Sequence, residues 1–252
     1  MKRLILIASI MLGGLTISQA YRQTETTHIE KQQEQEWQRG QTITLRPGQS
    51  ADELAALFAI TPIDEATEKR MREGGSYKDE CPIPLADLRY LHLVHYDYDG
   101  RIVCGEMVCH KIIAQKLIDV FTELFLAHYP IASIRLIDDF GANDEVSMSH
   151  NNSSCFCYRA VTGGKTLSRH ARGLAVDINP LHNPYVKINA QGGILKVEPN
   201  TPEAKAYAKR TPRKVHMIDH SDACYKAFTQ QGFFWGGAWR TIKDYQHFEW
   251  KR

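Results

Sequence analysis

The chain has 252 residues, with 31 lysines and arginines, 29 aspartates and glutamates and a formal net charge of +2. Without the two basic residues at its start, Lys2 and Arg3, the basic and acidic residues balance at 29 each. This balance leaves no basic stripe of the kind that binds nucleic acid or an anionic membrane surface. Because 43% of the residues are hydrophobic, the chain has material for one well-buried domain and an appendage.

The first 20 residues are typical of a secretory signal peptide. A short basic start is followed by an apolar run over residues 4–17, and Ser18-Gln19-Ala20 places small residues before a cleavage point. The apolar run is short for a bilayer span, and no cysteine follows it to carry a lipid anchor. We therefore predict a mature protein that begins near Tyr21, is exported to the periplasm or the outside of the cell and has no membrane span. An uncleaved membrane anchor is the alternative.

Residues 21–76 are predicted to form a polar N-terminal arm, ahead of a main domain that covers residues 77–252. The arm begins with a strongly polar stretch, which can bury little apolar surface. Acidic and aliphatic residues then alternate from Ala51 to Ile60. This pattern predicts a short amphipathic helix with Ser50 or Asp52 near its cap.

The main domain contains patterns of both strands and helices. After a charged, turn-rich stretch, an apolar strand pattern over residues 85–95 leads into the turn Asp97-Tyr98-Asp99-Gly100. Apolar residues then recur every three or four positions from Lys111 to His128, which predicts a helix with one buried face that ends before Pro130. The further predicted elements are a core strand over 131–140, a hairpin over 186–197 and helices over 201–208 and 222–231.

These elements follow one another without a βαβ rhythm, and no internal repeat is visible. A mixture of this kind favours an α+β fold with an antiparallel sheet over a parallel α/β fold.

Two segments of the sequence offer side chains that suit a metal ion. One contains His170 and Asp177, and the other, near the end of the chain, contains Asp244 and His247. A catalytic zinc site needs three nitrogen or oxygen ligands, a fourth position for water and a nearby base. We predict that His170, Asp177 and His247 bind the metal, although the ligand types alone would also admit iron or manganese.

The local sequence decides whether these ligands can meet. On a helix, His170 and Asp177 would be two turns, or roughly 10 Å, apart, which is too far to share one ion. Gly173 and the strand-favouring run over residues 174–178 predict instead a turn followed by a strand. This arrangement can fold His170 back beside Asp177.

The second segment is expected to be a half-buried strand, because Phe248 and Trp250 alternate with His247 and Glu249. Asp244 has the wrong parity to share a face with His247, so we expect it on the bend that enters this strand. Taken alone, each candidate ligand could instead be a hydrogen-bonded structural residue, and Asp244 could simply cap the strand.

The spacing of these residues resembles the signature S-x-H-x-x-G-x-A-x-D, followed much later by D/E-x-x-H, of a family of bacterial zinc peptidases. The family includes D-alanyl-D-alanine carboxypeptidases, D-alanyl-D-alanine dipeptidases and L-alanyl-D-glutamate endopeptidases that act on cell walls. The signature positions are filled by Ser168, His170, Gly173, Ala175, Asp177, Asp244 and His247. The resemblance covers residues 100–252 and continues through Ser147-Met148, Asn151-Asn152-Ser153-Ser154, Tyr158-Arg159, Asn179-Pro180-Leu181 and Trp235-Gly236-Gly237-Ala238-Trp239.

The resemblance implies a small central antiparallel sheet, flanking helices and a Zn²⁺ ion in a cleft. It also implies that Asp244 is the general base, which takes a proton from the attacking water and returns it to the leaving amine. Arg159 is similar to the family arginine that stabilises the oxyanion, and Ser168 and Ser154 are candidates for substrate contacts. The implied substrates are stem peptides of peptidoglycan, cut by a D-Ala-D-Ala carboxypeptidase or an L-Ala-D-Glu endopeptidase activity.

The alternative from another functional class is a non-catalytic module that keeps the zinc fold and only binds cell-wall peptides or a partner protein. Pure binding needs no base, so the presence of Asp244 and Arg159 favours the enzyme. The glycine-rich segment over residues 235–239 is expected to form a tight wall of the cleft, because glycine lets backbone approach closely. Core packing would explain its tryptophans equally well.

An even number of cysteines in an exported chain favours disulfides, although the sequence does not select a pairing. The alternative is a structural zinc site built from Cys104, Cys109, Cys155 and Cys157. The six cysteines are Cys81, Cys104, Cys109, Cys155, Cys157 and Cys224.

Overall fold

The computed structural model describes residues 37–159 and 166–251. The predicted signal peptide and the first part of the predicted arm, residues 1–36, lie outside the described residues. The chain from Trp37 onward forms one structural unit. None of the helices described in it is long and apolar enough to cross a membrane.

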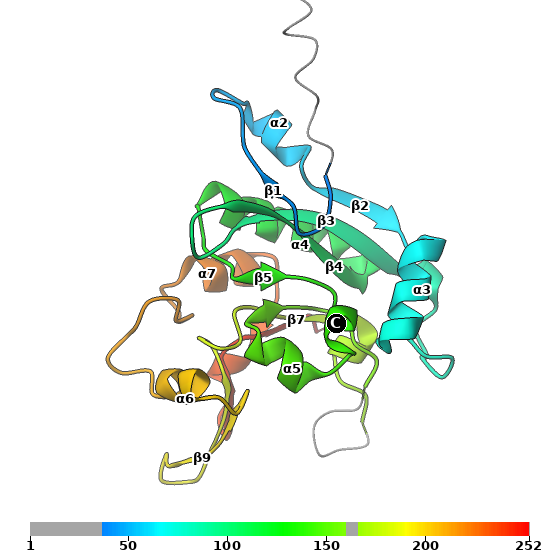
Figure 1. Ribbon diagram of the computed structural model, residues 1–252. Coiled ribbons are helices and arrows are strands. Elements are labelled where there is room, and N and C mark those ends of the chain that lie inside the picture. Colours follow the sequence, from blue (N-terminus) through cyan, green and yellow to red (C-terminus); the bar gives the residue numbers. More distant parts are fainter. Residues whose placement is uncertain (1–36, 160–165, 252) are drawn as a thin grey trace, which may run out of the picture. The chain divides into compact units, whose positions relative to one another are not determined.

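Two long antiparallel strands, β3 (Leu88–Tyr96) and β4 (Ile102–His110), dominate the N-terminal half (Figure 1). They confirm the predicted strand, and the predicted turn over residues 97–100 joins them. Two shorter strands, β1 (Thr42–Ile43) and β2 (Ala59–Pro62), pair antiparallel with the two edges. The resulting sheet has the order β1-β4-β3-β2.

The domain boundary predicted near Tyr77 lies inside this unit, because β1 and β2 from the predicted arm complete the sheet on β3 and β4. Helix α2 (Ala51–Ala55) confirms the short helix and begins at Ser50, which forms a capping box with Glu53. The helix is shorter than predicted, since the chain enters strand β2 at Ala59.

Helix α3 (Glu65–Gly74) replaces part of the turn-rich stretch expected from the sequence. It begins at Asp64, whose side chain accepts a hydrogen bond from the Thr67 N–H at 2.7 Å. Met71 is the one buried residue of the helix. A single apolar anchor gives no periodic pattern, which is why the helix was not predicted.

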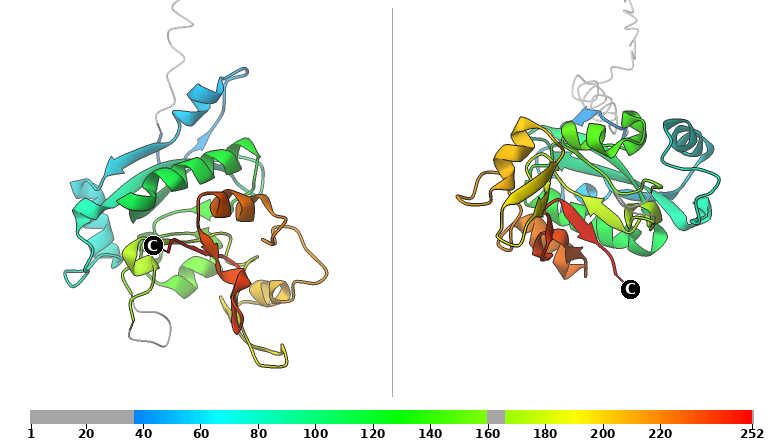
Figure 2. Two further views of the ribbon diagram at one scale, coloured as in Figure 1. Left: turned by 180° about the vertical axis from the view of Figure 1, so that it is seen from behind. Right: turned by 90° about the horizontal axis from the view of Figure 1, so that it is seen from below.

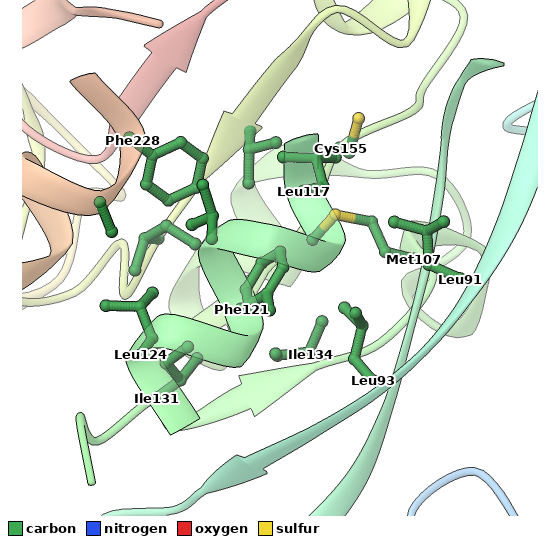
Figure 3. Packing of buried hydrophobic residues seen from close by; sticks show 14 of the residues in the cluster. Leu91, Leu93, Met107, Leu117, Phe121, Leu124, Ile131, Ile134, Cys155 and Phe228 are labelled. Carbon is green, nitrogen blue, oxygen red and sulfur yellow. The ribbon is translucent and has the colours of Figure 1, made fainter. Parts of the chain in front are cut away.

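Helix α4 (Lys111–Leu126) confirms the helix predicted from apolar periodicity. It ends two residues earlier than expected, ahead of His128, which has a positive φ of 52°. Helix α4 packs against β3 and β4 on one side and against α7 (Ala223–Gln230) on the other. Its apolar face is therefore removed from water, and this burial is the main stabilising contribution in this half. Figure 3 shows this packing through Leu91, Leu93, Met107, Leu117, Phe121, Leu124 and Phe228.

The core strand predicted over residues 131–140 was wrong for most of its length. Only β5 (Ser133–Ile134) is a strand, and it pairs in parallel with β6 (Asn152–Ser153). The chain then forms a short 3-10 helix, η2 (Ile137–Phe140). Leu136 and Ile137 are buried, so the apolar pattern reflects the burial of an irregular segment rather than extended structure.

Short antiparallel strands make up the C-terminal half. The hairpin predicted over residues 186–197 is confirmed as strands β8 (Tyr185–Ile188) and β9 (Ile194–Glu198), which project from the unit beside α6 (Pro202–Ala208) (Figure 2). Helices α6 (Pro202–Ala208) and α7 confirm the other two predicted helices. In strand order, one sheet contains β10 (Phe234–Trp235), β12 (His247–Glu249) and β7 (Ala175–Asp177), and the other contains β11 (Ile242–Asp244), β8 (Tyr185–Ile188) and β9 (Ile194–Glu198).

The structure confirms the mixed class with small antiparallel sheets and several helices. It corrects the single central sheet, because the described residues form four separate sheets of two to four strands.

The cysteines correct a second expectation. All six are free thiols, so the predicted disulfides are not formed. Cys104, Cys109, Cys155 and Cys224 pack in the main hydrophobic core, where a thiol behaves as a small apolar side chain. None of the cysteines joins a group that could hold a metal within the described part of the chain, so the alternative zinc site is also absent there.

Candidate metal and catalytic centre

The three predicted ligands meet at one point in the C-terminal half. His170, Asp177 and His247 each offer an atom, and these atoms lie within 4.8 Å of one another. His170 Nε2 is 3.3 Å from Asp177 Oδ2, His247 Nδ1 is 3.0 Å from Asp177 Oδ1, and the two ring nitrogens are 3.2 Å apart. Ligands placed tetrahedrally at about 2.0–2.2 Å from one zinc ion would have spacings of roughly 3.3 Å, so the three residues fit such an ion.

The predicted turn places His170. Residues His170–Arg172 form a 3-10 turn, η3, and Gly173 closes it in the left-handed conformation with a φ of 63°. A Cβ atom on Gly173 would lie 2.6 Å from the His110 backbone nitrogen, so this position requires glycine for space as well as for conformation. The turn brings His170 back beside β7, as the sequence predicts.

Strand pairing places the other two ligands. Residue His247 of β12 lies directly opposite Asp177 of β7 in the antiparallel register. Asp177 is held on its other side by Ser154, through backbone hydrogen bonds of 2.9 and 3.1 Å. Ser154 does not line the cleft described below. Its backbone supports a metal ligand, and the structure gives no support to the predicted substrate contact.

A hydrogen bond orients the His170 imidazole, and an ion-pair contact orients that of His247. His170 Nδ1 is 2.7 Å from the Cys155 carbonyl oxygen, so this nitrogen carries the proton and Nε2 faces the site. His247 Nε2 lies 3.6 Å from Glu249 Oε2, which leaves Nδ1 directed at the site. Glu249 was not predicted as a site residue. The available signal was its position two residues after His247, on the same face of the strand.

The charges of the site favour a bound cation. Burial alone would raise the pKa of Asp177, but the neighbouring imidazoles of His170 and His247 hold this pKa well below its usual range. Burial opposes the charged form of His247, yet hydrogen bonds to Asp177 and Glu249 raise its pKa to about 10. Carboxylates that draw a proton onto a buried imidazole would attract a metal ion for the same reason.

Asp244 lies beside the ligands, as the last residue of β11. The bend over residues 245–246 follows it, so Asp244 precedes the predicted bend rather than lying on it. Burial raises its pKa to about 7, with His247 and His170 opposing the rise and Asp177 adding to it. A carboxyl group with a pKa near neutrality can both accept and return a proton.

Arg159 also reaches the cleft, where it forms an ion pair with Asp144, the first residue of helix α5 (Asp144–Ser149). Burial raises the pKa of Asp144, and the Arg159 guanidinium opposes this rise. Asp144 was not predicted, because its local sequence indicates only the start of a helix. The pair holds the guanidinium in the cleft that the metal ligands also line.

Ser168 lies in the cleft wall but is buried. Its Oγ accepts a hydrogen bond from the His170 N–H at 3.2 Å, and its own N–H donates to the Arg159 carbonyl oxygen at 3.1 Å. These bonds connect the turn of a metal ligand to the backbone of Arg159. The observed role of Ser168 is therefore to support both residues, and its predicted substrate contact stays a prediction.

All of the predicted site residues except Ser154 line one cleft of about 780 Å³, together with Asp144 and Glu249. Trp239 forms part of its wall, with its ring 5.4 Å from the His247 ring. Trp235 is instead buried in the core. The expected cleft wall therefore holds for Trp239, and the alternative of core packing holds for Trp235. The β8–β9 hairpin contributes Tyr185 and Glu198 to the rim.

Comparison with known proteins gives one match. Residues 162–250 match a protein-family model described as D-alanyl-D-alanine carboxypeptidase. This match contains both halves of the motif and confirms the resemblance for that part of the chain, although it begins after Arg159. No curated protein and no solved structure matches the chain.

Proposed function

Because residues 162–250 match the family model of D-alanyl-D-alanine carboxypeptidases, we propose that the protein is a secreted zinc metallopeptidase of bacterial peptidoglycan. Its substrates are the stem peptides, and both D-Ala-D-Ala carboxypeptidase and L-Ala-D-Glu endopeptidase activities are compatible with the site. The observation that carries the proposal is the convergence of His170, Asp177 and His247 with Asp244 on one cleft.

His170, Asp177 and His247 would hold the metal, which supplies Lewis acidity for the scissile carbonyl and for the attacking water. One nitrogen of each imidazole faces away from the site, His170 Nδ1 toward the Cys155 carbonyl and His247 Nε2 toward Glu249. Both rings are therefore held in the orientation that ligation needs.

Asp244 would act as the general base. Its carboxylate takes a proton from the water as the water attacks the peptide carbonyl, and then delivers this proton to the leaving amine. Burial and the neighbouring Asp177 keep its pKa high, which makes both transfers feasible near neutral pH. A module that only binds peptides gains nothing from such a group.

Arg159 would stabilise the oxyanion that forms on the carbonyl oxygen. Its ion pair with Asp144 holds the guanidinium in place before the reaction. A charge that is already oriented stabilises the transition state without further reorganisation.

The test is a mass-spectrometric product analysis of muropeptides incubated with the zinc-loaded protein and with an Asp244→Asn variant. Loss of a terminal D-alanine, or a cut between the first two stem residues, is expected only with the unaltered protein and names the bond. If the protein holds zinc and no stem peptide is cleaved, the catalytic proposal is wrong and the binding module is favoured.

Export is supported by the leader pattern over residues 1–20. Sequencing the N-terminus of the protein recovered from the cell envelope or medium is expected to find a start near Tyr21.

A further inference from the structure

A second, smaller pocket lies next to the metal cleft. It has a volume of about 260 Å³, and five of the eight residues that line it are aromatic. They come from α7, the turn between α7 and β10, β10 itself and the segment that follows β10. The residues that carry the argument are Tyr225, Phe233, Phe234, Trp235, Trp239 and Lys251.

The pocket has a buried floor and an open rim. Phe233 and Trp235 are buried, and the Trp235 indole is fixed by a hydrogen bond from Nε1 to the Tyr245 carbonyl oxygen at 2.9 Å. Phe234 is 53% exposed, while Tyr225 and Trp239 are partly exposed. A rigid floor beneath accessible rings is a surface prepared for a ligand with an apolar face.

Strand geometry explains why Phe234 faces outward, but not why it is aromatic. In β10 the side chains alternate, and Trp235 takes the inward position opposite Phe248 of β12. Phe234 therefore must point to solvent, where a polar residue would be the ordinary choice. An exposed ring beside other accessible rings marks a binding surface more often than a single exposed apolar residue does.

Trp239 connects this pocket to the metal cleft, because it lines both cavities. Its ring lies 5.4 Å from the ring of the metal ligand His247. A molecule whose reacting bond lies in the cleft could thus place a neighbouring group in the aromatic pocket.

Lys251 adds a polar group at the edge of the pocket. Its Nζ lies 5.3 Å from the centre of the Phe234 ring and 2.8 Å from Glu249 Oε1. A pyranose ring offers C–H groups that pack on an aromatic face and hydroxyl or carbonyl oxygens that accept hydrogen bonds from an ammonium. Aromatic rings beside a hydrogen-bond donor therefore suit a sugar better than the short or charged side chains of a stem peptide.

From this arrangement we propose that the aromatic pocket binds a sugar ring of the glycan strand to which the stem peptide is attached. This inference rests on the proposed function and defines its substrate class further: stem peptides still linked to glycan are preferred over free peptides. The stem begins at a sugar, so for a cut between the first two stem residues, L-Ala and D-Glu, the two cavities would receive adjoining parts of one molecule.

The first experiment compares two substrates, a stem peptide linked to its disaccharide and the same peptide without sugar. The wild-type protein is expected to have a lower KM for the linked substrate. Phe234→Ala is expected to raise this KM roughly three- to tenfold, as loss of one aromatic contact predicts, and to leave cleavage of the free peptide unchanged. Equal KM values for both substrates with the wild-type protein would overturn the inference.

Leu126→Ala is the matched control, because Leu126 is 52% exposed and does not line the pocket. Calorimetric titration with the disaccharide alone provides a readout that needs no turnover. Binding by the wild type and by Leu126→Ala, with weaker binding by Phe234→Ala, is expected. Absence of disaccharide binding would disprove the sugar site, whereas disaccharide binding without cleavage of either peptide would contradict only the proposed peptidase.

Discussion

The two halves of the unit are stabilised in different ways. In the N-terminal half, strands of nine residues, β3 and β4, and helix α4 pack around an apolar core. In the C-terminal half, the strands that carry the metal ligands, β7 and β12, have three residues each. The buried side chains of these strands and of the turn η3 include His170, Asp177 and His247. Both halves contribute to one apolar core, which includes Val176 of β7 and Phe248 of β12. The C-terminal half depends in addition on polar groups that satisfy one another or a bound ion.

The largest expected effect comes from removing a ligand in the polar half. His247→Ala should abolish zinc retention and reduce peptidase activity to background, because two remaining ligands cannot hold the ion in a catalytic geometry. Metal content by mass spectrometry and muropeptide turnover measure the two effects. Asp244→Asn is the informative control, since it should keep the zinc and lose the turnover. A His247→Ala protein with full metal content would show that the metal lies elsewhere.

A change in the apolar core of the N-terminal half should lower the stability of the protein without affecting metal binding. Leu117 of α4 is completely buried, so Leu117→Ala should lower the free energy of unfolding by about 2–5 kcal/mol through lost burial and a residual cavity. Chemical denaturation measures this loss. Zinc stoichiometry and kcat of the folded protein should not change. Loss of zinc or of kcat under conditions where the protein stays folded would mean that the packing around Leu117 also positions the metal ligands.

The sequence predicted the centre of the site better than its surroundings, for a physical reason. His170 and Asp177 are seven residues apart, and Gly173 between them indicates the turn that joins them. This information is local, so the sequence carries it. Strand alternation likewise placed His247 on a strand, although all three residues of β12 are buried rather than only one face of it.

The missed features depend on contacts between distant parts of the chain. Asp144 and Arg159 pair across 15 positions with an intervening irregular segment, and no local pattern indicates such a pair. The segment over residues 131–140 has a strand-like apolar pattern, yet only Ser133–Ile134 is a strand and Ile137–Phe140 is a 3-10 helix, because tertiary contacts decide its conformation. Helix α3 has only Met71 as a buried anchor.

A smaller effect is expected from Glu249, which orients a ligand without touching the ion. Glu249→Gln removes the carboxylate that lies 3.6 Å from His247 Nε2. Metal affinity should fall about 10–100-fold, the usual loss when the hydrogen-bond partner of a ligand is changed. Competition with a chelator of known affinity measures it. Glu145→Gln, also in the cleft wall, is the control and should bind zinc normally.

The ion pair between Asp144 and Arg159 should affect turnover rather than metal binding. Asp144→Asn is expected to lower kcat about tenfold, less than the 10²–10³ typical of losing an oxyanion donor itself, because Arg159 remains but is less well oriented. Zinc content should be normal and KM little changed. Asp144→Glu should restore part of kcat. A variant that loses zinc instead would indicate that Asp144 supports the ligands.

The smallest expected effect concerns the cysteines, which occur in both halves. A disulfide would contribute about 2–5 kcal/mol, so a protein that contained one would lose thermal stability on reduction. Here all six thiols are free, and burial raises the pKa of Cys109, Cys155 and Cys224 well above the usual value. Protonated, buried thiols react slowly even in an oxidising compartment. The melting temperature should therefore be the same with and without reductant. Thiol titration of the protein denatured without reductant should find six free thiols. A lower number would mean that some of these cysteines form disulfides.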